Sequence, residues 1–197
     1  MEKKPILLAA TGNAHKLKEL QAIFADYYEI RPMSSAGFTD EIDETGSTFA
    51  ENAVIKAEAV CAATGLPAIA DDSGLAVTAL DGAPGVYSAR YAGKHGDDEA
   101  NNDLLLSRME GRTDREAFFV CALALKLPGK EPVIAEGRCP GTLLRARRGT
   151  GGFGYDPLFM YDPLGKTFAE LNEDEKNAVS HRARACEAMK EKMAAGL

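Results

Sequence analysis

The sequence predicts an α/β fold built on a mixed β-sheet with flanking helices. Short apolar runs alternate along the chain with helical patterns, which is typical of that class. Two long strand-like runs, residues 116–127 and 132–137, are joined by the turn Pro128-Gly129-Lys130. This pair predicts an antiparallel hairpin, so we expect parallel and antiparallel strands in one sheet. With 197 residues, of which 45% are apolar, the chain is long enough to bury a substantial core.

The N-terminal segment is expected to form a strand followed by a helix. The apolar run in residues 5–10 is too short for a secretion signal, so we predict a buried first strand. Leu17, Leu20 and Phe24 then recur at the spacing of one helix face. No apolar stretch of the sequence approaches the length that spans a membrane.

Residues 48–63 are predicted to form the second helix. Thr48 and Glu51 have the spacing of a capping box at its start, and Gly65 is placed to end it. A short strand over residues 68–70 is then expected to deliver the polar turn Asp71-Asp72-Ser73-Gly74.

The remaining elements are predicted from the same patterns. Residues 75–80 look extended or partly helical, and residues 97–109 are expected to form the third helix. Near the C-terminus Ser180 can cap a helix on which Ala185, Met189 and Met193 stack at i, i+4, i+8.

Charge and cysteine content narrow the class of protein. A net charge of −7 disfavours a broad grip on nucleic acid, although a few basic groups and one divalent metal can still hold a small polyanion. The four cysteines form no C-x-x-C pair, which disfavours a zinc site and a disulfide framework. We therefore expect reduced, mostly buried thiols in a cytosolic protein.

The first predicted strand runs directly into Thr11-Gly12-Asn13-Ala14-His15-Lys16 at a helix start. Unpaired backbone N–H groups and the helix dipole make such a turn suitable for phosphate, and Lys16 adds a positive charge. The segment lacks the spacing of a Walker A loop. An ordinary helix cap with a solvated lysine is the alternative interpretation.

Acidic residues follow in two separate loops. Asp43-Glu44 precedes the second helix and Asp71-Asp72 follows the next strand, so their carboxylates could converge on a hard cation such as Mg²⁺. Asn52 and Lys56 share a face of the intervening helix. Solvated turns are the alternative here.

Two further segments carry candidate binding residues. Residues 149–154 match the pattern G-x-G-x-x-G. A dinucleotide fingerprint needs a helix directly after this pattern, but here Tyr155-Asp156-Pro157 follows, and the residue before a proline resists helical geometry. We therefore predict a loop whose Phe153 and Tyr155 can receive a flat base. A predicted helix start carries three basic residues, Lys176, His181 and Arg182. Positive charges there interact unfavourably with the helix dipole unless an anion lies nearby. A packed glycine loop and a solvated helix end remain open as alternatives.

Taken in order, six motifs closely resemble the inosine triphosphate pyrophosphatase family, whose members are also called XTP/dITP diphosphatases. The motifs are Thr11-Gly12-Asn13-x-x-Lys16, Glu44-Thr45-Gly46, Asp71-Asp72-Ser73-Gly74-Leu75, Gly82-Ala83-Pro84-Gly85-Val86-Tyr87-Ser88-Ala89-Arg90-Tyr91, Gly149-Thr150-Gly151-Gly152-Phe153-Gly154-Tyr155-Asp156-Pro157 and Ser180-His181-Arg182. They span nearly the whole chain. The match departs from the family pattern at Cys139, where bulkier residues are frequent.

The resemblance implies an elongated sheet in a single domain of two lobes around a central cleft. It implies Mg²⁺-dependent hydrolysis of ITP, dITP and XTP to the monophosphate and pyrophosphate, by a cytoplasmic homodimer. Residues 11–16, Lys56 and Lys176 would hold phosphates, and Ser73 would contact the substrate. Asp72 would bind the metal and act as base, and Glu44 would assist the metal, with adjacent Asp43 as an alternative ligand. The base pocket would comprise Phe153, Gly154, Tyr155, Asp156, His181 and Arg182.

These residues suggest a mechanism. We expect Asp72 to orient or deprotonate the water that attacks the α-phosphorus, with Asp71 tuning Asp72 or holding waters near it. Arg182 or a backbone N–H facing O6 would favour 6-oxo purines over adenine. Competing interpretations are a phosphohydrolase for modified pyrimidines, which a substrate panel distinguishes, and a non-catalytic nucleotide sensor, which turnover distinguishes. Nucleic-acid binding is disfavoured by the acidic balance.

Overall fold

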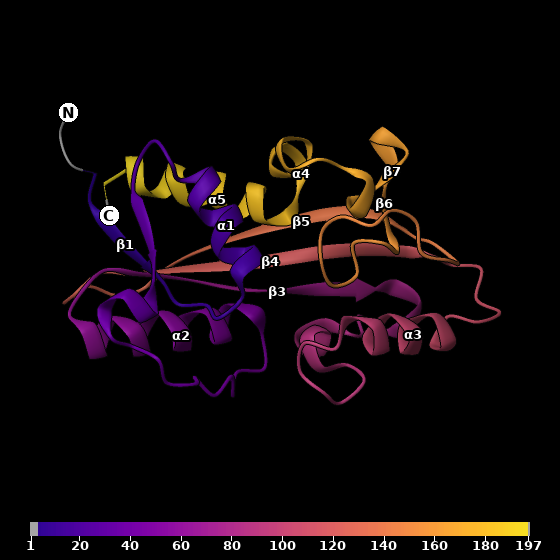
Figure 1. Ribbon diagram of the computed structural model, residues 1–197, viewed down its shortest axis with the longest axis horizontal. Coiled ribbons are helices and arrows are strands. Elements are labelled where there is room, and N and C mark those ends of the chain that lie inside the picture. Colours follow the sequence, from indigo (N-terminus) through magenta and orange to yellow (C-terminus); the bar gives the residue numbers. More distant parts are fainter. Residues whose placement is uncertain (1–3, 197) are drawn as a thin grey trace. The chain divides into compact units, whose positions relative to one another are not determined.

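The computed structural model of the chain describes residues 4–196, and in that part seven strands form one sheet in the order β2-β1-β3-β4-β5-β6-β7 (Figure 1). The strands are β1 (Ile6–Ala9), β2 (Glu29–Pro32), β3 (Ala68–Val77), β4 (Glu116–Lys126), β5 (Val133–Leu143), β6 (Phe159–Tyr161) and β7 (Lys166–Thr167). The helices are α1 (Ala14–Ile23), α2 (Phe49–Thr64), α3 (Asp98–Arg108), α4 (Glu173–Val179) and α5 (His181–Ala194). β1 pairs in parallel with β2 and β3, whereas β6 pairs antiparallel with β5 and β7, which confirms the mixed sheet.

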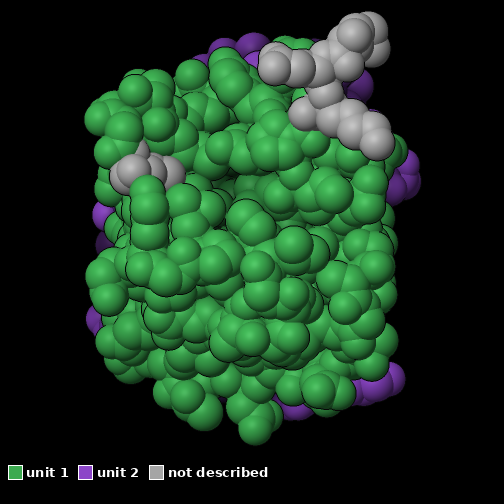
Figure 2. Space-filling model, turned by 90° about the vertical axis from the view of Figure 1, so that its left-hand side faces the viewer, with its two compact units in different colours: residues 1–72, 121–137, 182–197 green, residues 73–120, 138–181 purple. Residues whose placement is uncertain are grey.

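Contacts divide the chain into two compact units, coloured green and purple in Figure 2. Among the described residues, unit 1 takes in those up to 72, 121–137 and those from 182 onward, and unit 2 takes in 73–120 and 138–181. Because β3, β4 and β5 each contribute residues to both units, the polypeptide passes between the units within these strands.

Helices cover both faces of the strands in unit 1, with α1 and α5 on one face and α2 on the other (Figure 1). The strand alternation sorts the core accordingly, because successive side chains point to opposite faces. Leu7 and Ala9 of β1 pack in one buried cluster with α1 and α5. Leu8 and Ala10 pack in the other cluster with the small residues of α2.

Unit 2 has a core rich in aromatic rings. Phe119 of β4 lies with its ring centroid 4.7 Å from that of Phe159 and 5.6 Å from that of Phe168, the second pair being stacked. Leu105 of α3 and Leu75 of β3 are buried in the same cluster. Packed aromatic rings therefore supply much of the buried apolar surface of this unit.

Several predicted boundaries are confirmed. Thr48 caps α2 by accepting a hydrogen bond from the backbone N–H of Glu51, and Gly65 ends that helix in the left-handed conformation. The second half of the expected capping box differs, because the Glu51 carboxylate accepts from Ser47 instead of Thr48. In the C-terminal helix, Ala185 and Met189 are buried in the core as the spacing predicted.

The prediction of a turn at Asp71-Asp72-Ser73-Gly74 is wrong, because β3 continues without interruption from Ala68 to Val77. Asp71 and Asp72 are both buried, and each forms an ion pair with a lysine, Asp71 with Lys16 and Asp72 with Lys56. Tertiary partners thus override the turn preference of the local sequence. The extended or partly helical segment at 75–80 resolves into the end of β3 and a 3-10 turn, Thr78–Leu80.

The C-terminal region also differs from the prediction. Lys176 lies in the last turn of α4 rather than at a helix start, since Asn172 caps a short helix that the sequence analysis did not identify. β5 extends to Leu143, well beyond residue 137, and β2, β6 and β7 were not predicted. These strands are short, so their period-2 pattern is too brief to be recognised.

All four cysteines are free and buried, as expected for reduced thiols. Within residues 4–196, no helix combines the length and apolarity needed to cross a bilayer.

We predict that Gly74→Ala destabilises the protein. A β-carbon at this position would lie 2.3 Å from Ser88 Oγ and 2.7 Å from the Gly85 carbonyl oxygen. Ser88 cannot easily yield, because its hydroxyl donates to Gly85 O and accepts from Leu75 N. Overpacking of this kind costs about 1–3 kcal/mol, which urea unfolding would measure.

Gly12→Ala is the matched control, since a β-carbon there meets nothing within 4 Å. Equal unfolding free energies for the two variants would contradict the close approach at Gly74.

Candidate active site

Unit 1 brings Glu44, Lys56 and Asp72 together, as the sequence predicted. The Lys56 ammonium lies 2.6 Å from Glu44 Oε1 and 3.2 Å from Asp72 Oδ1. Asn52, one turn earlier on α2, donates from Nδ2 to Asp72 Oδ2 at 3.1 Å. Each Asp72 oxygen therefore has one protein donor and keeps further acceptor capacity.

Burial and charge act against each other in this cluster. Burial raises the pKa of Asp72 above its ordinary value, although Lys56 and Lys16 lower it. For Lys56, burial lowers the pKa, but Asp72 and Glu44 raise it by more, so the ammonium stays protonated. The cluster combines a carboxylate of increased basicity with a fixed positive charge.

The acidic loop is held against α2 by a close backbone approach. The Gly46 N–H donates to Asn52 Oδ1 at 2.8 Å, so Asn52 links the Glu44 loop to Asp72. A β-carbon on Gly46 would lie 2.7 Å from Asn52 Oδ1, which explains the need for glycine at this position. Asp43 is exposed, whereas the Glu44 carboxylate contacts Lys56, so the geometry favours Glu44 over its neighbour.

Glu44 and Asp72 suit a hard cation that takes few protein ligands. Both supply carboxylate oxygens, and Lys56 brings the two side chains to one point. Among the described residues no set of three or more His, Cys, Asp or Glu side chains is grouped for metal binding. Mg²⁺ fits such a pair, because it completes its shell with water and substrate phosphate oxygens.

The turn Thr11–Lys16 is a capped helix start. Asn13 Oδ1 accepts from the backbone N–H groups of His15 and Lys16 at 2.9 and 3.2 Å, and Thr11 Oγ1 accepts from the Asn13 N–H. Two N–H groups expected to be unpaired are therefore satisfied by Asn13 in this structure. The exposed Gly12, Ala14 and His15 leave the turn accessible to an anion.

Asp71 and Asp72 are neighbours in sequence but leave β3 on opposite faces. Asp71 lies on the α1 and α5 side, where Lys16 Nζ is 2.5 Å from Oδ1 and Arg182 Nε is 2.8 Å from Oδ2. Arg182 also donates to Glu19, and the Cys121 thiol donates to Asp71. Burial, and after it the Glu44 carboxylate, raises the pKa of Asp72. A role of Asp71 in tuning Asp72 or holding waters near it stays a prediction.

Asp71 and Arg182 form a buried charge pair. Burial raises the pKa of Asp71, but Arg182 and Lys16 more than offset this and hold it well below its ordinary value. Arg182 is fully buried, and three of its nitrogens donate to Asp71 or Glu19. The positive charge of Arg182 at the start of α5 is thus balanced by carboxylates of unit 1 itself, those of Asp71 and Glu19.

Unit 2 holds the predicted aromatic loop as a loop, not a helix start. The Asp156 carboxylate accepts from the Phe153 N–H at 2.9 Å and from Lys176 Nζ at 2.7 Å. Gly152 has a φ of +71°, and a β-carbon there would lie 2.1 Å from Asp156 Oδ2. Lys176 Nζ is 4.6 Å from the centroid of the Phe153 ring. Within unit 2, Lys176 therefore lies beside the loop that carries Phe153 and Asp156.

The other predicted residues of unit 2 are placed by its core. Tyr155 is buried and donates its hydroxyl to the Ser88 carbonyl at 2.8 Å. His181 stacks on Phe119 with ring centroids 4.6 Å apart, which continues the aromatic stack from Phe168. Ser73, the first residue of unit 2 in β3, is partly exposed.

Sequence reasoning missed four residues that contact the candidate site. Glu19 and Cys121 contact Arg182 and Asp71, and Asp98 and Asn102 of α3 contact Gly154. No local pattern in the sequence indicates these contacts, because the partner of Asn102 lies 52 residues away and that of Asp98 lies 56 residues away.

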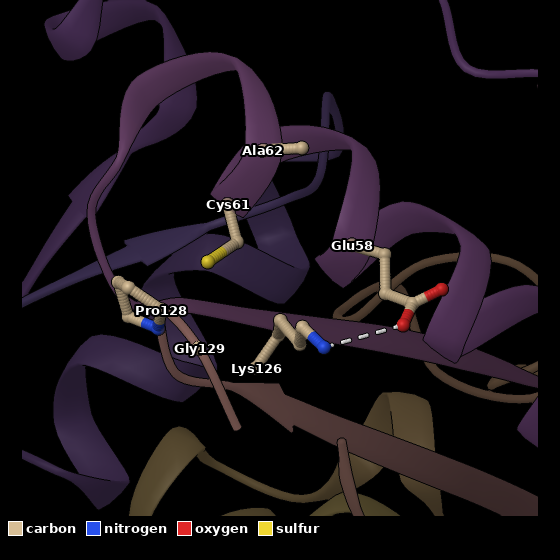
Figure 3. Close-up of a pocket in the computed structure, with 6 residues that line it drawn as sticks. All are labelled: Glu58, Cys61, Ala62, Lys126, Pro128 and Gly129. Carbon is tan, nitrogen blue, oxygen red and sulfur yellow. Dashed lines mark ion pairs between the residues drawn. The ribbon is translucent and has the colours of Figure 1, made fainter. Parts of the chain in front are cut away.

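A cavity of about 450 Å³ lies elsewhere in unit 1 (Figure 3). It is lined by Glu58, Cys61, Ala62, Lys126, Pro128 and Gly129. Lys126 and Glu58 form an ion pair at 3.4 Å, and burial raises the pKa of the Cys61 thiol. A raised pKa disfavours the reactive thiolate of Cys61, and Lys126 is paired with Glu58, so we do not assign the chemistry to this cavity.

Comparison with known proteins gives one consistent result. A model of the Ham1 family matches residues 7–192. A dITP/XTP pyrophosphatase of Streptomyces coelicolor is 50% identical over 188 residues, which cover 93% of this chain and 94% of the relative. A dITP/XTP pyrophosphatase of Bacillus subtilis is 49% identical over 181 residues, covering 90% and 91%. The solved structure of a HAM1 protein from Coxiella burnetii is 42% identical, with a TM-score of 0.88, and the match covers 98% of this chain and 100% of that one.

We predict that Asp71→Asn lowers stability at neutral pH by about 3–5 kcal/mol, because Arg182 stays buried with half its counter-charge gone. The folded-state pKa of Asp71 lies well below its ordinary value. Its stabilising effect is therefore complete above about pH 4 and is lost as the pH falls from there toward the folded-state pKa. The gap between wild type and variant should narrow below about pH 4 in urea unfolding.

Asp26→Asn, at an exposed position of the same unit, is the control. If Asp71→Asn unfolds at the same urea concentration as this control at pH 7, the Asp71–Arg182 pair contributes nothing to the fold.

Proposed function

Because the chain belongs to the Ham1 family, we propose that it hydrolyses ITP, dITP and XTP to the nucleoside monophosphate and pyrophosphate. This activity removes non-standard purines from the nucleotide pool. The resemblance to the inosine triphosphate pyrophosphatases is thereby confirmed at the level of the family. The observation that carries the proposal is the Asp72 carboxylate, held by Asn52 and Lys56 with Glu44 beside it.

Hydrolysis of the α–β anhydride requires an oriented water and neutralised phosphate oxygens. Water attacks the α-phosphorus, its proton passes to the Asp72 carboxylate, and the bond to the leaving pyrophosphate breaks. Asn52 and Lys56 fix the plane of the Asp72 carboxylate, so its remaining lone pairs face a defined direction. Each oxygen of the Asp72 carboxylate has a single protein donor, Lys56 on Oδ1 and Asn52 on Oδ2, so acceptor capacity remains for the water proton.

The residues of unit 1 also supply the charges that a triphosphate needs. Lys16, at the start of α1, and Lys56 carry positive charge within the same unit. We propose that Glu44 and Asp72 together hold Mg²⁺, which when bound neutralises charge on the phosphate oxygens. The capped turn of residues 11–16 would add backbone dipoles to this binding.

Base selectivity is assigned to unit 2. A 6-oxo purine presents an acceptor at O6 where adenine presents an amino donor, so a fixed donor in the pocket rejects ATP. Arg182 is engaged with Asp71 and Glu19, whereas Lys176 lies beside Phe153 and Asp156. We propose Lys176 as the donor to O6 and Phe153 as the ring on which the base stacks.

Two further features belong to the proposal. A homodimer is expected from the family resemblance, and analytical ultracentrifugation of the purified protein tests it. A cytoplasmic location agrees with four free, buried thiols and with an activity on the nucleotide pool.

We predict that Asp72→Asn lowers kcat for ITP by at least a hundredfold, because an amide cannot take the proton of the attacking water. Thermal unfolding should show that the variant is folded, since Asn keeps the shape of the side chain. The exposed-site variant Asp26→Asn is the control for loss of one carboxylate. Near-normal turnover by Asp72→Asn would reject Asp72 as the base.

The substrate is tested by measuring pyrophosphate release from ITP, XTP, GTP, ATP, dUTP and dTTP, with and without Mg²⁺. We expect Mg²⁺-dependent release of pyrophosphate from ITP and XTP. Release from GTP, ATP, dUTP and dTTP should be at least tenfold slower. GTP shares O6 with ITP, so its exclusion depends on the 2-amino group. Equal hydrolysis of GTP and ITP would contradict the proposed selectivity, and preference for dUTP would indicate a pyrimidine enzyme.

A further inference from the structure

Both polar groups of the Gly154 backbone are held by the first turns of α3. Asp98 Oδ2 accepts from the Gly154 N–H at 2.7 Å, and Asn102 Nδ2 donates to the Gly154 carbonyl at 2.9 Å. Asp98 and Asn102 lie four residues apart and so share one face of the helix. The N–H and the carbonyl of Gly154 belong to successive peptide planes, so these two side chains fix both planes.

Gly154 needs such support to keep one conformation. Its φ is +60°, a conformation that glycine adopts freely but does not maintain without contacts. It connects Phe153 to Tyr155, so a rotation at Gly154 would move one ring relative to the other. On either side the loop is already fixed, since the Phe153 N–H is bound by Asp156 and the Tyr155 hydroxyl by Ser88 O.

The composition of the contact also indicates a specific role. Asn102 is buried, and its Nδ2 donates both to Gly154 O and to Asp98 O. Its Oδ1 is buried without a hydrogen-bond partner among the described residues. An unsatisfied buried acceptor destabilises the fold, because it has lost its hydrogen bond to water. An apolar residue would avoid that cost, but it could not hold the Gly154 carbonyl.

We propose that Asp98 and Asn102 are positioning residues for base recognition, which act by fixing Gly154 and through it Phe153 and Tyr155. This assignment rests on the proposed function, because it concerns the pocket that distinguishes 6-oxo purines from adenine. Neither residue needs to touch the substrate. Their loss would lower the ratio of kcat/KM for ITP to that for ATP, since the stacking ring of Phe153 would no longer keep one position beside Lys176, the proposed donor to O6.

The test compares Asp98→Ala with Glu99→Ala, its matched control. Both variants remove one acidic residue from the first turn of α3 and thus the same favourable interaction with the helix dipole. Glu99, whose side chain is 81% exposed, pairs only with Arg147 on the surface among the contacts described. We expect Asp98→Ala to lose at least about tenfold in kcat/KM for ITP, since small misplacements are costly, and to lose less for ATP. Glu99→Ala should keep the wild-type ratio.

Asp98→Asn distinguishes the hydrogen bond from the charge, because its amide oxygen can still accept from the Gly154 N–H. We expect this variant to recover most of the ITP-to-ATP ratio. Asn102→Ala removes the other contact independently and serves where Asp98→Ala does not fold. A role in stability alone would lower both rates equally, since the fraction of folded enzyme cancels in the ratio.

A measurement without substrate accompanies the kinetics. Hydrogen exchange of the Gly154 amide, followed by NMR, should accelerate at least tenfold in Asp98→Ala but not in Glu99→Ala. An unchanged selectivity ratio in both Asp98→Ala and Asn102→Ala, with ITP turned over by the wild type, would overturn the positioning role alone. A wild type that does not hydrolyse ITP would overturn the proposed function and this assignment with it.

Discussion

The alternation of side chains along β3 is the constraint on which the candidate site depends. Because Asp71 and Asp72 are consecutive in a strand, they point to opposite faces, and each meets a different set of basic groups. Asp72 faces α2, where Lys56 and Asn52 lie, and Asp71 faces the side of α1 and α5. Two consecutive residues thus serve both faces of the sheet: Asp72 belongs to the candidate active site, and Asp71 forms the buried ion pair with Arg182.

The two faces differ in how their charges are balanced. Asp71 is fully buried, and Arg182 and Lys16 keep it ionised, which makes it a fixed counter-ion. Asp72 shares a single lysine with Glu44, and burial leaves its pKa raised. A carboxylate with surplus negative charge around it is suited to a cation or a proton, whereas a neutralised one is suited to holding elements together.

Much of this arrangement could be predicted from the sequence where the signals are local. The cap at Thr48, the glycine at 65 and the stacked Ala185 and Met189 follow from spacing alone. The continuation of β3 through Asp71 could not be predicted, because Arg182 is 111 residues away and supplies the charge that allows burial. The same holds for Asp98, whose partner Gly154 is 56 residues distant. Local propensity favoured a turn at Asp71 and an ordinary helix start at Asp98.

The division of β3, β4 and β5 between the two units governs how the protein can be dissected. The polypeptide crosses from one unit to the other after residues 72, 120, 137 and 181, so neither unit is a continuous stretch of chain. No single proteolytic cut or gene truncation can release either unit intact. A break in any of these three strands interrupts an element that contributes residues to both units. We therefore expect a circular permutant to fold only where its new ends lie outside β3, β4 and β5.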